Sequence, residues 1–122
     1  MLEDLALRNN DFKRRYREIS TKFRSRLYNT KTLLTKTVMS TAPSYYISYD
    51  YARRLLSLYR RNKLPKSYNP LRHMMIAEIA SRVDAIKTSK TSHAEGRALV
   101  RVLARGNASR FFITIPTAMR LI

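Results

Sequence analysis

The chain of 122 residues contains no cysteine and only two glycines, Gly96 and Gly106, both late in the sequence. Without cysteine, disulfides, thiolate metal sites and a cysteine nucleophile are excluded. Tight turns that need a positive φ favour glycine, so its scarcity disfavours a fold of many hairpins and favours helices. No window is long and apolar enough to span a membrane. The acidic, amphipathic start MLEDLALRNN does not have the layout of a signal peptide.

Acidic residues are also scarce, because 8 Asp and Glu face 25 Lys and Arg and the formal net charge is +17. Hydrophobic residues make up 44% of the chain, which indicates a folded domain rather than a disordered basic tail. A folded domain of this charge repels itself unless a polyanion is near, and nucleic acid is the usual partner because neutralised phosphates release counterions. Charge that serves solubility alone, or binding to an anionic membrane, fits less well. Basic residues are spread over the whole chain and few acids balance them.

The residues expected of an enzyme are missing. His73 and His93 are the only histidines, and neither has a second histidine or a cysteine at ligand spacing. The acids form no paired set suited to metal-dependent nuclease chemistry, and no glycine-rich phosphate loop occurs. A tyrosine nucleophile with arginine support is conceivable, but nothing else of a recombinase site is evident. We therefore predict a protein without enzymatic activity, cofactor, metal or small-molecule substrate.

Apolar residues at helical spacing, beginning with Phe12, Tyr16 and Ile19, predict one long helix or two stacked helices over residues 2 to about 39. Asn29–Thr30 is the candidate break, because both residues are poor helix formers. Further helices are expected over about 49–62, 70–87 and 93–105, with a short helix after Thr114, whereas 40–48 and 107–114 are expected to be extended.

Capping residues mark the expected helix ends. Ser48 is an N-cap for the helix over 49–62, and Asn69 precedes a proline at the first position of the next helix. Ser92 with Glu95 three residues later predicts a capping box for the helix over 93–105. Gly106 suits the C-terminal end of that helix.

An internal repeat is the most informative pattern, because residues 45–56 (YYISYDYARRLL) align with 111–122 (FFITIPTAMRLI) at an offset of 66. Each half then consists of a helix, an extended aromatic segment and a capped helix. The extended segments could pair as a short two-stranded ribbon, or each could pack its aromatic residues into the same core. The predicted fold class is all-α, a compact helical domain of four to five helices with this repeat. The chain 1–122 is predicted to be a single basic domain, with a helical N-terminal region over 1–40 and a repeat-containing core over 41–122.

The segment APSYYIS is followed by ARRLL, a basic loop, Asn69–Pro70 and a second aromatic pair in FFIT. This order, over about residues 38–122, resembles small basic proteins of unknown function from Bacteroides-type gut bacteria and their tailed phages. The resemblance implies a prokaryotic cell, a mobile element or a virion as the setting. It implies no activity and assigns no site residue.

Basic residues on the helix predicted over 93–105 are the first candidate for a nucleic-acid contact. Arg97, Arg101 and Arg105 recur every four residues and form one continuous helix face without an acid. Guanidinium groups about 6 Å apart suit phosphates or guanine edges in a major groove. The helix also follows a short polar connection, TSKTS, as the second helix of a helix-turn-helix does.

Three further sets of basic residues are candidates. The basic loop between Tyr59 and Tyr68 carries no acid and suits phosphate clamping. The first helix is basic around its whole circumference, so not all its cations can face one duplex. The tyrosine pairs could stack on unpaired bases, although such aromatic residues more often belong to a core. The candidate residues are Arg60, Arg61, Lys63 and Lys66 in the loop, Arg53 and Arg54 in the helix before it, and Lys13, Arg14, Arg15, Arg17, Lys22, Arg24 and Arg26 in the first helix.

Charge and inventory together predict a nucleic-acid-binding protein, with double-stranded DNA favoured over RNA. It would be a regulator or architectural protein of a phage or mobile element. The first alternative is a virion or assembly protein that packs against DNA or an acidic subunit, and the second is an RNA- or ribosome-associated protein. Its expected location is the cytoplasm, associated with the nucleoid, or a virion, and a homo-oligomer is one expected state.

Overall fold

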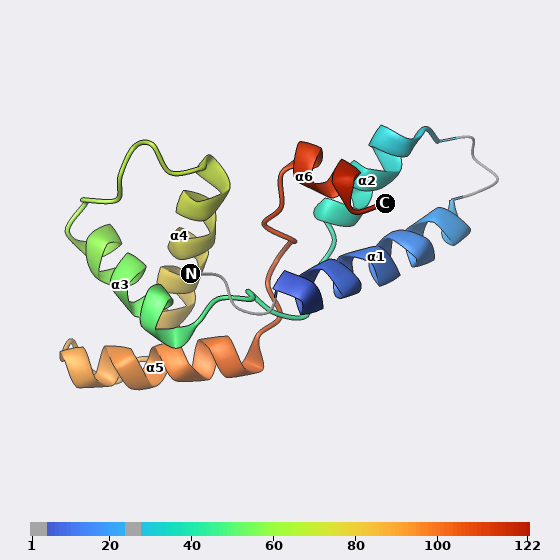
Figure 1. Cartoon of the computed structure of the whole chain (residues 1–122). Helices are drawn as coiled ribbons and strands as arrows, with labels where there is room; N and C mark the ends of the chain where they lie inside the picture. Colours follow the sequence, from blue (N-terminus) through green and yellow to red (C-terminus); the bar gives the residue numbers. More distant parts are fainter. Residues whose placement is uncertain (1–4, 24–27) are drawn as a thin grey trace. The chain divides into compact units, whose positions relative to one another are not determined.

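Within residues 5–23 and 28–122, which the computed structural model describes, the chain forms six helices and no strands (Figure 1). The all-α prediction is confirmed. The expected four to five helices become six because the N-terminal region forms two helices, with Asn29 as the N-cap of the second. The helices are α1 (Leu5–Lys22), α2 (Thr30–Val38), α3 (Tyr49–Arg60), α4 (Pro70–Ile86), α5 (Ser92–Arg105) and α6 (Ile115–Arg120).

Side-chain caps begin three of these helices where the sequence predicts. Ser48 Oγ accepts the backbone N–H of Tyr51 at the start of α3. Asn69 Oδ1 accepts the N–H of Leu71 at the start of α4, directly before a proline at the first helical position. Thr114 caps α6 in the same way. Each cap satisfies a backbone donor that the helix leaves without an internal partner.

The start of α5 differs from the prediction. Thr91, not Ser92, is the N-cap, and its hydroxyl accepts the N–H of Ala94 at 3.1 Å. The predicted capping box between Ser92 and Glu95 is therefore wrong, because Ser92 is already the first helical residue. Gly106 ends the helix with φ 46, in the left-handed region that glycine adopts without steric cost.

The contacts of the chain group into two compact units, called unit 1 and unit 2 below. Unit 1 is formed by residues 47–106 and contains α3, α4 and α5, each of which packs against the other two. Unit 2 contains α1 and α2 from the first part of the chain and α6 from its end, with α2 packed against both. The chain therefore leaves unit 2 after Tyr46 and returns to it after Gly106.

The core of unit 1 is aliphatic. Leu55 and Leu56 of α3, Ile76 and Ile79 of α4, and Leu99 of α5 are all buried. The apolar spacing over about 70–87 predicts that Met74 and Met75 both lie on the core side of this helix. Met74 is instead 49% exposed, so this prediction is wrong for Met74. Met74 lies only four residues after the first residue of α4, and the residue beside it, Met75, fills the core position.

The core of unit 2 brings aromatic residues from both ends of the chain together. Phe12 of α1 and Phe111 meet edge to face, with ring centroids 5.5 Å apart. Ala42 and Ala108 form an isolated antiparallel bridge, in which each N–H donates to the other carbonyl at 3.0 and 2.9 Å. The two extended segments thus meet at this bridge and also share a core. The internal repeat itself stays a prediction.

Unit 2 contains a buried polar contact at Tyr46, the residue after which the chain leaves this unit. The hydroxyl of Tyr46 donates to Asp11 Oδ2 at 2.6 Å, and the other carboxylate oxygen of Asp11 pairs with Arg14 at 2.9 Å. Tyr46 has φ 55, an uncommon conformation for a residue with a side chain, and its N–H donates to Ser44 Oγ. Burial, followed by the hydrogen bond to Asp11, raises the pKa of Tyr46 above its ordinary value.

We expect Tyr46→Phe to lower the free energy of unfolding by about 1–3 kcal/mol, because a buried carboxylate oxygen loses its donor. Urea unfolding at pH 7 measures the change. Tyr59→Phe is the matched control, since Tyr59 is 38% exposed, and should change stability by less than about 0.5 kcal/mol. Equal effects of the two substitutions would contradict the role of the buried contact.

We expect alkaline pH to lower the free energy of unfolding of the wild-type protein more than that of the Tyr46→Phe variant. Because the folded state holds the Tyr46 proton more tightly, this contribution to stability is complete below the ordinary tyrosine pKa of about 10. It is lost as pH rises further, by up to about 1.4 kcal/mol per pH unit. Urea unfolding from about pH 8 to 11 should therefore show a narrowing stability difference between the two proteins. A constant difference would show that the folded state does not raise the pKa of this hydroxyl.

Candidate nucleic-acid interface

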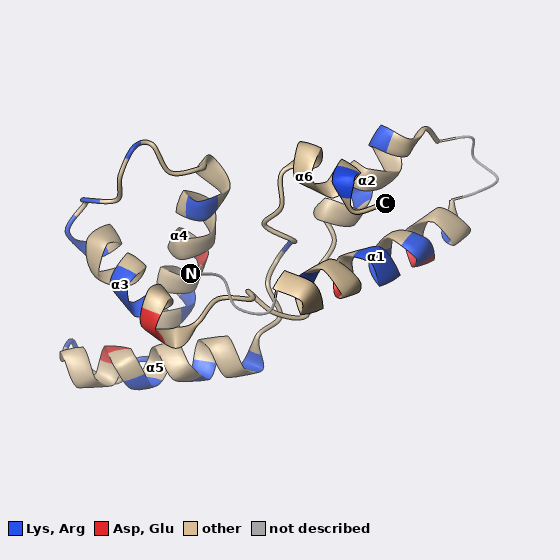
Figure 2. Cartoon of the chain, in the orientation of Figure 1, with Lys and Arg blue, Asp and Glu red and all other residues tan. Residues whose placement is uncertain are grey.

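One side of α5 carries a row of exposed arginines that borders α4. Residues on the adjoining side, including Ala98, Leu99 and Val102, are buried against α3 and α4. Arg97, Arg101 and Arg105 are all exposed, and Figure 2 shows basic residues recurring along this helix. We call these three residues the α5 arginine row. Helical spacing of four residues explains both the buried and the exposed side.

The described acids of unit 1 do not pair with the α5 arginine row. Among the residues that the structure describes, no acid forms an ion pair with the α5 arginine row. The one acid of this helix, Glu95, points to the core side and accepts from Arg60 Nε at 2.9 Å. The row therefore presents positive charge to solvent without internal compensation. Such a surface attracts a polyanion.

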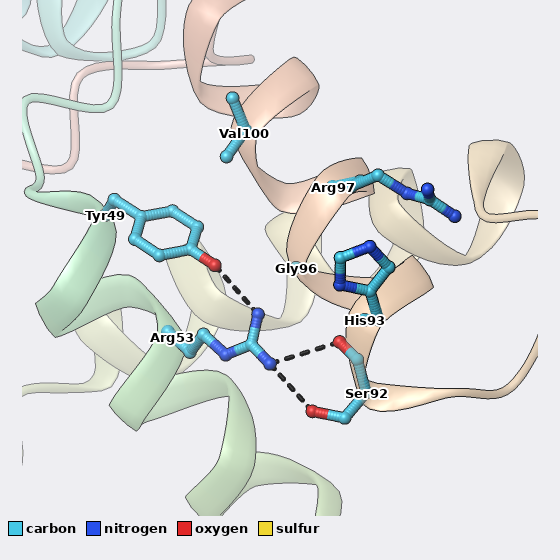
Figure 3. A pocket seen from close by; sticks show the side chains of 7 residues that line it. All are labelled: Tyr49, Arg53, Ser92, His93, Gly96, Arg97 and Val100. Carbon is cyan, nitrogen blue, oxygen red and sulfur yellow. Dashed lines mark hydrogen bonds between the residues drawn. The ribbon is translucent and has the colours of Figure 1, made fainter.

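Arg53, which the sequence predicts as a nucleic-acid contact, joins α3 to α5 through hydrogen bonds. Its Nη1 donates to the hydroxyl of Tyr49 at 2.8 Å (Figure 3). Its Nη2 donates to both the carbonyl and the hydroxyl oxygen of Ser92, at 3.1 and 2.7 Å. The guanidinium thus links the first turns of the two helices. Three of the five N–H donors of Arg53 are used in these bonds, which join α5 to α3.

Gly96 makes room for this guanidinium. A Cβ at position 96 would overlap Arg53 Nη1 and lie 3.0 Å from the Tyr49 hydroxyl. Glycine inside a helix costs up to about 1 kcal/mol relative to alanine. A side chain at this position would displace the Arg53 guanidinium from its place beside Ser92. In the sequence, a glycine inside a predicted helix indicates that another group approaches the backbone closely, but it does not identify that group.

Two pockets flank the N-terminal half of α5. The larger, of about 450 Å³, is lined by Tyr49, Arg53, Ser92, His93, Gly96, Arg97 and Val100, and Figure 3 shows His93 and Arg97 on the same side of α5. The smaller, of about 170 Å³, lies on the α4 side and includes Lys87, Arg97 and Arg101. Arg97 borders both pockets. Cationic and hydroxyl donors around these hollows suit phosphate oxygens.

Arg60 belongs to an ion-pair network rather than to a free loop. Its guanidinium binds both carboxylate oxygens of Asp84, at 2.6 and 3.0 Å, and also Glu95. Lys87 joins the same two acids. The hydrogen bonds from Arg60 lower the pKa of Asp84, and those to Asp84 raise the pKa of Arg60. The donors of Arg60 are thus largely committed inside unit 1.

The other residues predicted in the basic loop are exposed. Lys63 and Lys66 point to solvent, whereas Arg61 donates to the carbonyl of Ser57 at 3.3 Å. Arg54 is exposed and lies over the ring of Tyr51. The structure therefore does not bring all the predicted residues to one surface, since Arg53 and Arg60 face α5 while Arg54 and the loop do not.

The basic residues of α1 lie in unit 2. Arg14 pairs with Asp11 and Arg15 with Glu18, while Lys13 and Arg17 are exposed. Lys22, in the last turn of α1, is also exposed. Arg24 and Arg26 lie outside the described residues.

Tyr45 and Tyr46 are 4% and 6% exposed. The hypothesis that this tyrosine pair stacks on unpaired bases is therefore wrong, because the rings are used in the core of unit 2.

The described part of the chain contains neither a candidate metal site nor a candidate membrane-spanning helix. Its residues contain no cluster of three or more His, Asp and Glu side chains that could hold a metal ion. None of its helices combines the length and the apolar character that crossing a membrane requires.

No protein-family model, curated protein or solved structure matches the chain. The resemblance to small basic proteins of Bacteroides-type bacteria and their phages therefore stays a prediction, and no residue assignment here depends on it.

We expect Gly96→Ala to stabilise the protein more in an Arg53→Ala background than in the wild type. In the wild type, the new methyl group displaces the guanidinium and its hydrogen bonds, which offsets the gain in helix propensity. Without Arg53 the gain of about 0.5–1 kcal/mol is kept. A double-mutant cycle by urea unfolding measures the coupling. Equal effects in both backgrounds would show that Arg53 does not occupy this place.

Proposed function

We propose that the protein binds double-stranded DNA through the α5 arginine row and serves as a regulator or architectural protein of a phage or mobile element. The observation that carries the proposal is the exposed face of α5, on which Arg97, Arg101 and Arg105 have no ion pair with a described acid. Neutralisation of phosphates by these side chains supplies the affinity.

The dimensions of α5 support this contact. Its 14 residues span about 21 Å, and the row itself extends over about 12 Å. An α-helix fits the major groove of B-DNA, where arginine can bind guanine O6 and N7. Val100, 52% exposed, lines the larger pocket beside Arg97 and offers an apolar contact for a thymine methyl group. Phosphate contacts dominate this arrangement, and base contacts are few.

The connection between α4 and α5 also supports it. α5 follows α4 after five residues and packs against it, as the second helix of a helix-turn-helix does. The major groove of A-form RNA is too deep and narrow for side chains to read, so an exposed helix face favours duplex DNA over duplex RNA. The setting in a phage or mobile element rests on the sequence resemblance alone.

We expect Arg101→Ala to weaken duplex DNA binding and to reduce the slope of log Kobs against log salt by about one unit. Replacing all three residues of the α5 arginine row should reduce it by about three units. Fluorescence anisotropy with matched DNA and RNA duplexes, from about 50 to 300 mM salt, measures both quantities.

Arg60→Gln is the matched control, because it removes the same charge from a side chain already paired with Asp84 and Glu95. Its slope should change by clearly less than that of Arg101→Ala. An unchanged slope after loss of the whole α5 arginine row would remove α5 from the interface. Binding to neither duplex would instead favour a protein partner, as in virion assembly.

A further inference from the structure

Unit 1 carries a second set of arginines that are held in place by tyrosine rings. We propose that this set, which we call the tyrosine–arginine ladder, is a second contact surface for the phosphate backbone of nucleic acid. The ladder consists of Tyr51, Arg54, Tyr68 and Arg72. The inference rests on the proposed function and names a part of the interface that the α5 arginine row does not include.

The ladder alternates cations and rings. The Arg54 guanidinium carbon lies 5.3 Å from the centroid of Tyr51, and that of Arg72 lies 6.0 Å from the same ring. Arg72 is also 4.7 Å from the centroid of Tyr68, so it contacts two rings. These separations lie within the range of cation–π attraction. α3, the loop after it and the first turn of α4 are thereby joined.

The guanidinium donors of the ladder are not used by acids. No ion pair with a described acid forms at Arg54 or Arg72. Arg54 is exposed and Arg72 half-buried. Ring contacts satisfy neither the charge nor the N–H groups of a guanidinium, which has five donors in a planar fork. Oriented arginines without acidic partners suit the oxygens of a phosphate.

Unpaired bases are a poorer fit for the same surface. A base needs an open ring face on which to stack. Tyr51 already has two guanidinium groups over it, and Tyr68 has Arg72 over it and the ring of His73 beside it, 6.5 Å away between centroids. The rings therefore position the arginines, and the arginines are the groups left to bind. We commit to the phosphodiester backbone as the partner.

The ladder is separate from the α5 arginine row. Arg53 and Arg54 are neighbours in the chain, yet Arg53 bonds to Ser92 of α5 while Arg54 lies over the ring that Arg72 of α4 also contacts. Arg72 precedes Ile86, which lines a pocket beside Arg97 and Arg101, by about 21 Å along α4. The two surfaces therefore contribute phosphate contacts at different places along unit 1.

The first test replaces the two cations of the ladder. Arg54→Gln with Arg72→Gln should reduce the salt slope of duplex DNA binding by about two units and weaken binding by roughly 10-fold or more at about 100 mM salt. Lys31→Gln with Arg120→Gln, two exposed residues of unit 2, removes the same charge as a control. Urea unfolding of both variants verifies that they remain folded.

A second variant separates orientation from charge. Tyr51→Leu keeps both arginines but removes the ring between them. It should leave the salt slope nearly unchanged while it weakens binding by about 2- to 10-fold, because the guanidinium groups must then be ordered on binding. An effect on stability alone, with unchanged DNA affinity, would assign the ladder a structural role only.

The outcomes distinguish this inference from the proposed function. A ladder variant that behaves like the unit 2 control, while loss of the α5 arginine row weakens binding, overturns the ladder and leaves the proposed function intact. The reverse result removes α5 from the interface and keeps the ladder. If the wild-type chain binds no duplex at all, both proposals fail.

Discussion

Unbalanced positive charge is the constraint on which the structure depends. With 8 acids for 25 basic residues, each ion pair inside the fold uses a scarce partner. Unit 1 places Asp84 and Glu95 on the same guanidinium, that of Arg60, and brings Lys87 to them. These pairs reduce repulsion where α3, α4 and α5 meet. Among the described residues, the α5 arginine row, Lys63 and Lys66 are exposed, and the proposed contact with a polyanion would use such exposed cations.

Arginine therefore has three different roles within one short segment of unit 1. Arg53 anchors α3 to α5, Arg54 lies on a tyrosine ring, and Arg60 is held by two acids. A single basic surface would require all three to face the same way. Because their partners differ, Arg53 and Arg60 are bound within unit 1, whereas Arg54 is exposed to solvent. The two surfaces proposed for binding, the α5 arginine row and the tyrosine–arginine ladder, consist of arginines without a described acidic partner.

Much of the fold could be predicted from the sequence because its signals are local. Helices are capped by bonds to backbone groups two or three residues away from Ser48, Asn69 and Thr114. Gly106 ends α5 because glycine adopts the left-handed conformation without steric cost. The exception at Ser92 is also instructive. Either Thr91 or Ser92 can cap a helix, and tertiary bonds from Arg53 engage Ser92 while Thr91 takes the cap.

The sequence by itself determined the helical class, most helix ends, the net charge and the spacing of the α5 arginine row, since these depend on neighbouring residues and on composition. Only the tertiary structure decided which arginines have free donors. Arg60 meets acids 24 and 35 residues away, and the Tyr46 hydroxyl reaches an aspartate 35 residues earlier. Such pairings depend on how helices pack, and no local pattern in the chain encodes that.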